Sequence, residues 1–230
     1  MRLIRSGALD PALNLALDEA LLRSGKSTLR LYAWDPPGLS LGYFQAADEF
    51  ASVEGFTLVR RPTGGGAIAH TGELTLAYVG RRRRVGEVYA LVNAVVAAAA
   101  QRLGGPALEL GKATPSPASG GLCFDTSTCY DLGTGSGKVF GSAQRRAGDF
   151  FLLHGTLVLQ ENPLSRGAVS LSKLAGRSIS RAEAEEAVIA AATDTWGIRL
   201  VTAPPTAEEW ADARRLVLER YGAESWTKRR

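Results

Sequence analysis

The order of apolar and polar residues predicts helices in several parts of the chain. Asp10-Pro11 is a typical helix start, and apolar residues at positions 13, 17, 20 and 21 share one face of a helix expected to run through residue 22. Residues 85–103 predict the strongest helix, because they are rich in alanine and Gly104-Gly105-Pro106 follows them. Residues 180–195 and 206–221 predict two more, and acids near the start of the first suit its N-terminal dipole.

Strands are predicted where short apolar stretches alternate and end at Gly, Pro or Asp. These stretches are residues 29–34, 40–43, 57–60, 73–79, 108–110, 130–132, 138–144, 150–160 and 199–202. Residues 133–137 predict the turn of a hairpin, and residues 112–121 predict a loop rich in Pro, Ser and Gly. The sum is an α+β domain with a mostly antiparallel or mixed central sheet flanked by helices. We expect a single domain over residues 1–230, without an accessory C-terminal domain.

Composition excludes several classes of protein. The chain has 230 residues, of which 45% are hydrophobic and 22% charged, which is ordinary for a globular domain and untypical of disorder, collagen or a coiled coil. The N-terminus carries no apolar run of signal-peptide length, and the most apolar stretch, residues 94–100, is too short to cross a bilayer. We therefore expect a soluble, cytoplasmic protein without a membrane partner.

The formal net charge of +4 is concentrated in a few places. Arginines fill positions 81–84, a pair stands at 145 and 146, and the chain ends Lys228-Arg229-Arg230. Each run alone is most simply a solvated basic surface, and the functional alternative is a landing area for an acidic partner. We do not expect nucleic-acid binding, because no aromatic-rich recognition motif accompanies the arginines.

Three consecutive glycines follow two arginines in the segment 60–66, which reads Arg-Arg-Pro-Thr-Gly-Gly-Gly. Such glycines occur where a backbone turns sharply or lets a ligand approach its N–H groups, and those groups can form a concavity that binds anions. A flexible hairpin tip is the simpler interpretation of the triplet alone. The neighbouring arginines and the apolar strand that follows favour a binding loop.

Cys123 and Cys129 lie in one loop-like segment and are too few for a disulfide framework. With only two histidines in the chain, they also lack the partners of a zinc site, so we expect no metal there. A buried, inert thiol is the usual state of a lone cysteine, whereas an accessible thiol near cations is a nucleophile. Lys138 opens an otherwise small and apolar strand, where it is either a solvated lysine at a hairpin end or a group that neutralises an oxyanion.

Taken together, these segments resemble the family of lipoate–protein ligase A and octanoyltransferases, within the biotin/lipoate ligase-like fold. The resemblance covers residues 10 to about 225, in the family's order. It rests on five motifs: Asn14-Leu15-Ala16-Leu17-Asp18-Glu19-Ala20, Trp34-Asp35-Pro36-Pro37 with Ser40-Leu41-Gly42-Tyr43-Phe44-Gln45, Arg60-Arg61-Pro62-Thr63-Gly64-Gly65-Gly66-Ala67 with His70, Gly137-Lys138-Val139-Phe140-Gly141-Ser142-Ala143-Gln144, and His154-Gly155-Thr156-Leu157.

The resemblance implies roles for particular residues. In the cysteine-dependent branch, the cysteine matching Cys123 carries the acyl group as a thioester, and the lysine matching Lys138 contacts the acyl carbonyl. Tyr130-Asp131-Leu132 and Glu73-Leu74-Thr75 favour this branch. The resemblance implies substrate binding by Arg61, Thr63, Gly64, Gly65, Gly66, His70, Gly141, Ser142, His154, Gly155 and Thr156. His154 taken alone, inside an apolar strand, is more typical of a core histidine.

Two enzyme classes stay open. An octanoyltransferase would move an octanoyl or lipoyl group from acyl carrier protein through Cys123 to the lysine of a lipoyl domain or glycine-cleavage H protein, with no further cofactor. An ATP-dependent lipoate–protein ligase would use ATP and Mg²⁺ to make lipoyl-adenylate, and Cys123 would be incidental. Gly66, where the transferases often have arginine, and Thr71, where they often have an acid, are closer to the ligases.

Overall fold

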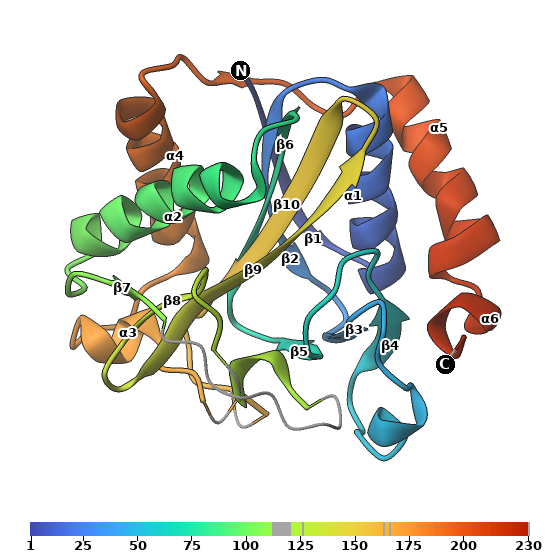
Figure 1. Cartoon of the computed structure of the whole chain (residues 1–230), viewed down its shortest axis with the longest axis horizontal. Helices are drawn as coiled ribbons and strands as arrows, with labels where there is room; N and C mark the ends of the chain where they lie inside the picture. Colours follow the sequence, from blue (N-terminus) through green and yellow to red (C-terminus); the bar gives the residue numbers. More distant parts are fainter. Residues whose placement is uncertain (112–120, 126, 163, 166, 230) are drawn as a thin grey trace.

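A mixed β-sheet forms the central layer of the protein. The computed structural model describes residues 1–111, 121–125, 127–162, 164–165 and 167–229. Within them an eight-stranded sheet has the order β11-β1-β2-β6-β10-β9-β8-β7 (Figure 1). Its strands are β1 (Arg2–Leu9), β2 (Thr28–Trp34), β6 (Leu74–Arg81), β7 (Glu109–Leu110), β8 (Leu132–Thr134), β9 (Gly137–Ala147), β10 (Phe150–Leu157) and β11 (Val201–Thr202). Strand β1 pairs in parallel with β2 and β11, and the other pairs are antiparallel, which confirms the expected mixed sheet.

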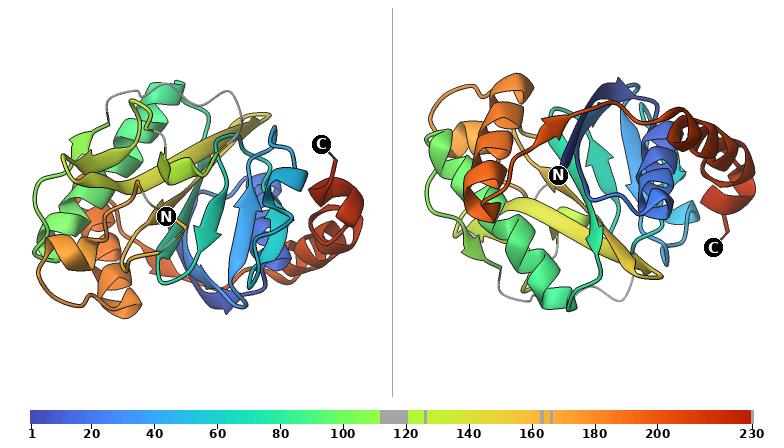
Figure 2. Two further views of the ribbon diagram at one scale, coloured as in Figure 1. Left: turned by 90° about the horizontal axis from the view of Figure 1, so that it is seen from below. Right: turned by 90° about the horizontal axis from the view of Figure 1, so that it is seen from above.

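Helices cover both faces of this sheet (Figure 2). Helices α2 (Val85–Arg102) and α4 (Arg181–Trp196) pack on one face. Helix α1 (Pro11–Ser24) packs on the other face, and α5 (Ala207–Leu216) packs against the outer side of α1. Two shorter helices are α3 (Leu171–Leu174) and α6 (Glu224–Thr227). The α+β class expected from the sequence is therefore confirmed, with the apolar core divided between the two sides of the sheet.

A second, three-stranded sheet stands beside the first and carries the glycine loop. Its order is β4-β3-β5, with β3 (Gly38–Leu41), β4 (Thr57–Arg60) and β5 (Ile68–His70). The three glycines lie in the connection from β4 to β5, so this small sheet presents them towards the large one. Strand β5 was not predicted, because three residues are too few to show a strand period.

Helix α1 begins at the predicted cap, since the Asp10 carboxylate accepts from the backbone N–H groups of Ala12 and Leu13. Leu17, Ala20 and Leu21 of the expected apolar face are buried, and the polar residues Asp18 and Glu19 are buried as well. The helix lies between the sheet and α5, so it has little solvent face, and its buried acids bind arginines and tyrosines instead.

Other differences lie at the ends of elements. Strand β1 was not predicted. The helix predicted over residues 206–221 is α-helical only as far as Leu216, and Val217–Tyr221 forms a π-helical turn. The hairpin between β8 and β9 turns at Gly135-Ser136. Most of the loop predicted over residues 112–121 lies outside the described residues. No helix in the described part of the chain is long and apolar enough to cross a membrane.

Candidate active site

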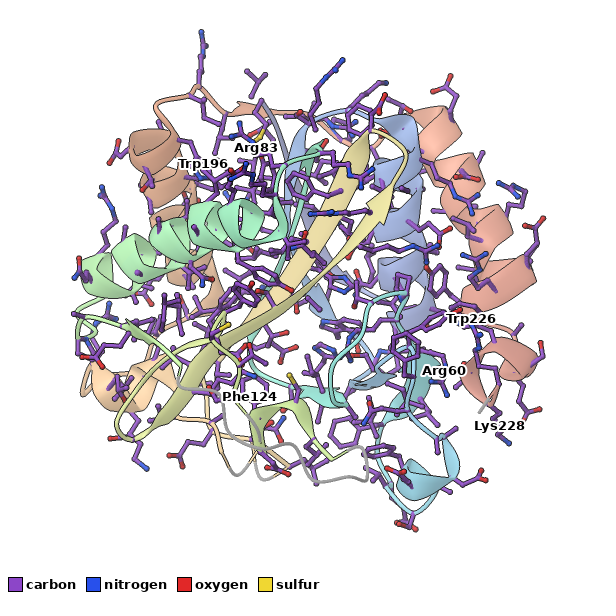
Figure 3. All side chains as sticks on the ribbon, in the orientation of Figure 1. Arg60, Arg83, Phe124, Trp196, Trp226 and Lys228 are labelled. Carbon is purple, nitrogen blue, oxygen red and sulfur yellow. The ribbon has the colours of Figure 1, made fainter. Side chains whose placement is uncertain are left out.

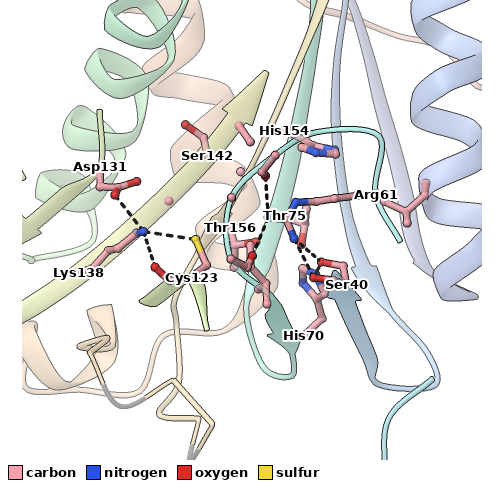
Figure 4. Close-up of a pocket in the computed structure, with 18 of the residues that line it drawn as sticks. Ser40, Arg61, His70, Thr75, Cys123, Asp131, Lys138, Ser142, His154 and Thr156 are labelled. Atoms are coloured by element: carbon pink, nitrogen blue, oxygen red, sulfur yellow. Dashed lines mark hydrogen bonds and ion pairs between the residues drawn. The ribbon is translucent and has the colours of Figure 1, made fainter. Parts of the chain in front are cut away.

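A pocket of about 620 Å³, including its open mouth, lies between the large sheet and the glycine loop. It brings together both predicted catalytic residues and most of the predicted binding residues (Figure 4). The lining residues that the sequence singled out are Arg61, Gly64, Gly65, Gly66, His70, Cys123, Lys138, Gly141, Ser142, His154, Gly155 and Thr156. Thr63 does not line the pocket itself, and its hydroxyl lies behind it against His154.

Cys123, Lys138 and Asp131 form a compact group at one wall of this pocket (Figure 4). Lys138 Nζ lies 3.4 Å from Cys123 Sγ, 3.0 Å from the Cys123 carbonyl oxygen and 3.0 Å from Asp131 Oδ2. The Asp131 carboxylate also accepts from the backbone N–H of Thr128 at 2.7 Å. An ammonium group has three donors, and these three acceptors fix its position beside the thiol.

Of the two alternatives left open for Lys138, the structure excludes the solvated lysine, since the residue is only 6% exposed. The side chain turns inward because Gly141, three residues along β9, leaves room for it. A Cβ atom on Gly141 would stand 2.6 Å from Lys138 Cε. Asp131, also buried, supplies the countercharge that a buried ammonium group needs.

The glycine loop lies directly against the cysteine segment. Cys123 N donates to the Ala67 carbonyl at 2.8 Å, and a Cβ atom on Gly66 would stand 2.8 Å from Cys123 N and 2.6 Å from the Gly121 carbonyl oxygen. Only a residue without a side chain fits there unless the backbone moves. Gly66 therefore lets the turn Cys123–Asp125 approach the loop.

Arg61 is buried and braces the glycine loop from behind. Its guanidinium donates to the carbonyl oxygens of Ser40 at 2.7 Å, Gly64 at 2.8 Å and Gly66 at 2.7 Å. Burial lowers the pKa of Arg61 to about 10, and negative charge on Cys123 opposes the shift. The guanidinium is therefore still a cation at neutral pH and lies where it favours a thiolate.

Arg60 points away from the pocket, to the other side of the small sheet (Figure 3). It donates to the carbonyl oxygens of Gly42, Gln45 and Thr227, while the Trp226 indole N–H donates back to the Arg60 carbonyl at 2.9 Å. Arg60 thus ties α6 to the segment after β3, and it does not line the pocket.

Comparison with known proteins agrees with this geometry. Residues 10–166 match the model of the lipoyl protein ligase A/B catalytic domain. The chain belongs to this family. Octanoyltransferase LipM of Kyrpidia tusciae is 33% identical over 271 aligned residues, which cover all of this chain and 98% of that protein. The relatives make the chain an octanoyltransferase-like enzyme, as the sequence resemblance implied.

Solved structures of lipoate-protein ligases share the fold. Lipoate-protein ligase A bound with ATP superposes with a TM-score of 0.83 at 24% identity, covering 99% of this chain and 98% of that one. A bi-partite lipoate protein ligase from Thermoplasma acidophilum gives a TM-score of 0.78 at 23% identity, covering 99% and 95%. At this identity the two structures establish the architecture, and the chemistry has to be argued from the pocket.

Both histidines of this lipoyl ligase A/B domain stand between a hydroxyl group and a carboxylate. His70 Nε2 lies 2.8 Å from Ser40 Oγ, and its Nδ1 lies 2.8 Å from Glu73 Oε1. Burial lowers the pKa of His70, although Glu73 acts in the opposite direction. His70 is therefore a neutral imidazole at pH 7, and its Nδ1–H faces the carboxylate.

The second histidine belongs to a different environment. His154 Nε2 lies 2.7 Å from Thr63 Oγ1, and its Nδ1 lies 3.1 Å from Asp18 Oδ2. Burial acts to raise the pKa of Asp18, but Arg30 at 2.6 Å and His154 outweigh it and the net shift is downward. Asp18 is thus already neutralised by an arginine.

Sequence reasoning assigned no role to four polar residues that the structure places at the site. Asp131 binds Lys138, Ser40 and Glu73 bind His70, and Thr75 accepts from the Trp34 indole N–H at 2.9 Å. All four stand inside segments that carried the resemblance. That membership was the available signal, and it does not by itself tell a functional partner from a neighbour.

Proposed function

We propose that this enzyme transfers an octanoyl group from octanoyl-acyl carrier protein, through a thioester on Cys123, to the lysine of a lipoyl domain or of glycine-cleavage H protein. The observation that carries the proposal is the contact of 3.4 Å between Lys138 Nζ and Cys123 Sγ inside the pocket. A neighbouring ammonium group stabilises a thiolate, and the thiolate is the nucleophilic form of cysteine. Exchange between two thioesters is close to isoenergetic, so the reaction needs no nucleotide.

In the first step the Cys123 thiolate attacks the thioester carbonyl of the donor. Negative charge develops on the carbonyl oxygen, and the Lys138 ammonium group, already beside the sulfur, is placed to receive it. None of the described residues accepts a hydrogen bond from the amides of Gly64, Gly65 or Gly66, so these amides are also available as donors. The intermediate then expels the carrier's thiolate, which leaves octanoyl on Cys123.

The apolar part of the pocket suits an alkyl chain. Its walls include Leu15, Ile68 and the rings of Tyr32 and Trp34. Binding sites for small apolar groups have this composition, with a few polar groups at the reacting end. We place the octanoyl chain along these residues and its carbonyl between Cys123 and the glycine loop.

The alternative is an ATP-dependent lipoate–protein ligase, which the triple glycine and the shared fold keep open. In that enzyme the arginines and the glycine amides would hold phosphate. Here Arg61 lines the pocket, but its guanidinium already donates to three backbone carbonyls. Arg60 points away from the pocket. This geometry favours the transferase.

The test is intact-mass measurement after mixing the protein with octanoyl-acyl carrier protein, with and without ATP. We expect one octanoyl adduct without nucleotide, removable by hydroxylamine as a thioester is. The adduct should form on Cys129→Ala, because Cys129 is exposed and lies outside the pocket. It should not accumulate on Cys123→Ser, since a hydroxyl is a poor nucleophile at neutral pH. Full activity of Cys123→Ala with free lipoate and ATP would establish the ligase instead.

A further inference from the structure

Ser40 and His70, on the wall of the pocket opposite Lys138 (Figure 4), form a buried chain of three polar groups with Glu73 behind them. Ser40, His70 and Glu73 are 1%, 3% and 7% exposed, and both hydrogen bonds between them measure 2.8 Å. The His70 ring stacks on Trp34 with centroids 3.8 Å apart and planes 12° apart. Stacking and two hydrogen bonds fix the ring, so this geometry is set before any substrate arrives.

The direction of the hydrogen bonds follows from the chemistry of the three groups. Glu73 as a carboxylate can only accept, so His70 Nδ1 carries the proton that faces it. Nε2 of the neutral ring is then an acceptor, and the Ser40 hydroxyl donates to it. Arg61 Nη1 lies 3.4 Å from the Ser40 oxygen and donates to it, which leaves one lone pair for a further donor. Ser40 and His70 both line the pocket.

This arrangement faces the cysteine across the pocket. Ser40 pairs with Ile68 in the small sheet, and Ile68 belongs to the apolar cluster that packs against Cys123. Arg61 also donates to the Ser40 carbonyl and to the Gly66 carbonyl, whose residue abuts Cys123. Ser40 and the sulfur thus face the same space from two walls.

The second half of the proposed reaction needs a proton acceptor. An amine that attacks the thioester becomes positively charged and must lose a proton before a stable amide forms. Lys138 cannot take that proton as an ammonium group, and the leaving Cys123 thiolate is held beside it. A general base at this step contributes typically 10²–10⁴-fold to a rate.

We infer that Ser40, His70 and Glu73 form a proton relay for the aminolysis step, an inference that rests on the proposed transferase function. The neutral amine of the acceptor lysine attacks the thioester carbonyl, and a C–N bond forms. The amine gives a proton to Ser40 Oγ while Ser40 gives its own proton to His70 Nε2. The C–S bond then breaks, Cys123 leaves as a thiolate beside Lys138, and the His70 imidazolium is stabilised by Glu73.

The second histidine does not fit the same role. Its carboxylate partner, Asp18, is already paired with Arg30 at 2.6 Å and accepts from Tyr32 at 2.9 Å. That carboxylate therefore has less charge to offer an imidazolium than Glu73, whose partner among the described residues is His70. We assign the His154 group to the support of the glycine loop, through Thr63.

Charged groups around His70 are consistent with a base that returns its proton after each turnover. Glu73 on the segment before β6 favours the imidazolium, whereas Arg61 and His154 across the pocket disfavour it. Because Arg61 and His154 oppose the effect of Glu73, the protonated form of His70 is short-lived. A proton relay needs such a form, since the base must release its proton before the next turnover.

The experiment separates the two half-reactions. Octanoyl-enzyme is prepared from octanoyl-acyl carrier protein, isolated, and mixed with a lipoyl domain in a single-turnover assay. For Glu73→Gln, which keeps an oxygen to accept the Nδ1–H but loses the charge, we expect transfer to fall by about 100-fold, and by a larger factor than formation of the octanoyl-enzyme. Ser40→Ala, which removes the hydroxyl, should show the same selectivity for the second step.

The matched control is Thr63→Val, which removes the corresponding hydroxyl from the other histidine. It should change the two half-reactions by similar factors, because its role is structural. A second readout replaces the lipoyl domain by hydroxylamine, a far less basic amine that sheds its proton more easily. The gap between wild type and Glu73→Gln should narrow with it, since a merely structural defect would persist for both nucleophiles.

The outcomes distinguish failure of the relay from failure of the transferase function. Equal loss of both half-reactions in Glu73→Gln and Ser40→Ala, or no loss of transfer in either, would overturn the relay and leave the transferase standing. Absence of any octanoyl-enzyme in wild type would overturn the transferase function, and the relay with it.

Discussion

Replacement of Lys138 by alanine should both unfold the protein at a lower temperature and slow its reaction. The ammonium group and the Asp131 carboxylate are 3.0 Å apart, with side chains only 5% and 4% exposed. Removing one partner of a buried pair leaves the other charge uncompensated, which typically costs about 3–5 kcal/mol. Solvent screening reduces this little, because both side chains are more than nine-tenths buried.

The expected shift in melting temperature follows from the size of the chain. For domains of roughly 150–250 residues, 1 kcal/mol corresponds to about 2–4 °C, so Lys138→Ala should melt roughly 6–20 °C below wild type. The double variant Lys138→Met/Asp131→Leu should recover part of this loss, because it leaves no buried charge behind. Turnover should fall about tenfold to a thousandfold in both variants, by analogy with loss of one oxyanion donor.

Thermal unfolding followed by circular dichroism, together with turnover well below the melting temperature, measures the two effects separately. The double variant is the control, since it distinguishes loss of the ion pair from loss of chemistry. If Lys138→Ala melts within about 1–2 °C of wild type, Lys138 is solvated in the native protein and does not form the buried ion pair with Asp131. If its turnover is also unchanged, Lys138 has no role in the reaction.

Two further predictions concern the glycine loop and the basic surface. Gly66→Ala should lower octanoyl transfer at least tenfold in an assay of turnover, because its Cβ would stand 2.6–2.9 Å from the backbone of Gly121 and Cys123. The control Gly64→Ala should be close to wild type, because its Cβ would meet only Phe44 at 3.9 Å. Equal activities of the two variants would refute the close approach of Gly66 to the cysteine segment. Neutralising Arg81–Arg84 should weaken binding of acyl carrier protein and flatten its dependence on salt, since exposed charges are screened over about 8 Å at physiological ionic strength. Unchanged affinity and salt dependence would dismiss this role.

The position of the arginine run limits how it can act. Arg81 pairs with Phe150 at one end of the central strands, and the same end of β9 carries Arg145 and Arg146. Seven residues of strand separate Lys138 from Arg145, or about 23 Å at 3.3 Å per residue, and Arg83 and Phe124 stand far apart in Figure 3. The run can therefore hold a carrier protein only at a distance from the thiol.

The elements that the sequence predicted well are those whose stability is local. Helix α2 begins at the predicted residue and ends within one residue of the prediction, because its alanines favour a helix and glycines follow it. Strand β1 was missed since only Leu3 and Ile4 are buried between Arg2 and Arg5. Those arginines pair with Glu209 and Glu185, partners about 200 residues away along the chain that no local pattern reveals.

The residues of the site also fall into those that local sequence indicates and those that depend on distant partners. The chemistry of their side chains made Cys123 and Lys138 candidates, and the family resemblance gave them roles. The structure places the two 3.4 Å apart. Their partner Asp131 lies seven residues before Lys138, across a hairpin whose exact turn decides which side chains meet. Likewise Ser40 meets His70 only because β3 and β5 pair in one register. Such contacts depend on the register of strands, which the apolar pattern does not fix.

The glycine loop contacts both walls of the pocket. A side chain on Gly66 would collide with the neighbouring backbone. On one wall Gly66 abuts Cys123, beside the ammonium group of Lys138; on the other Arg61 binds the Ser40 carbonyl. Arg61 binds the Gly66 carbonyl as well, so a shift of the loop moves both walls together. The Arg61 guanidinium donates to the Ser40, Gly64 and Gly66 carbonyls, so a phosphate that bound it would have to replace these contacts. For this reason we propose that the loop serves acyl transfer rather than the binding of a nucleotide.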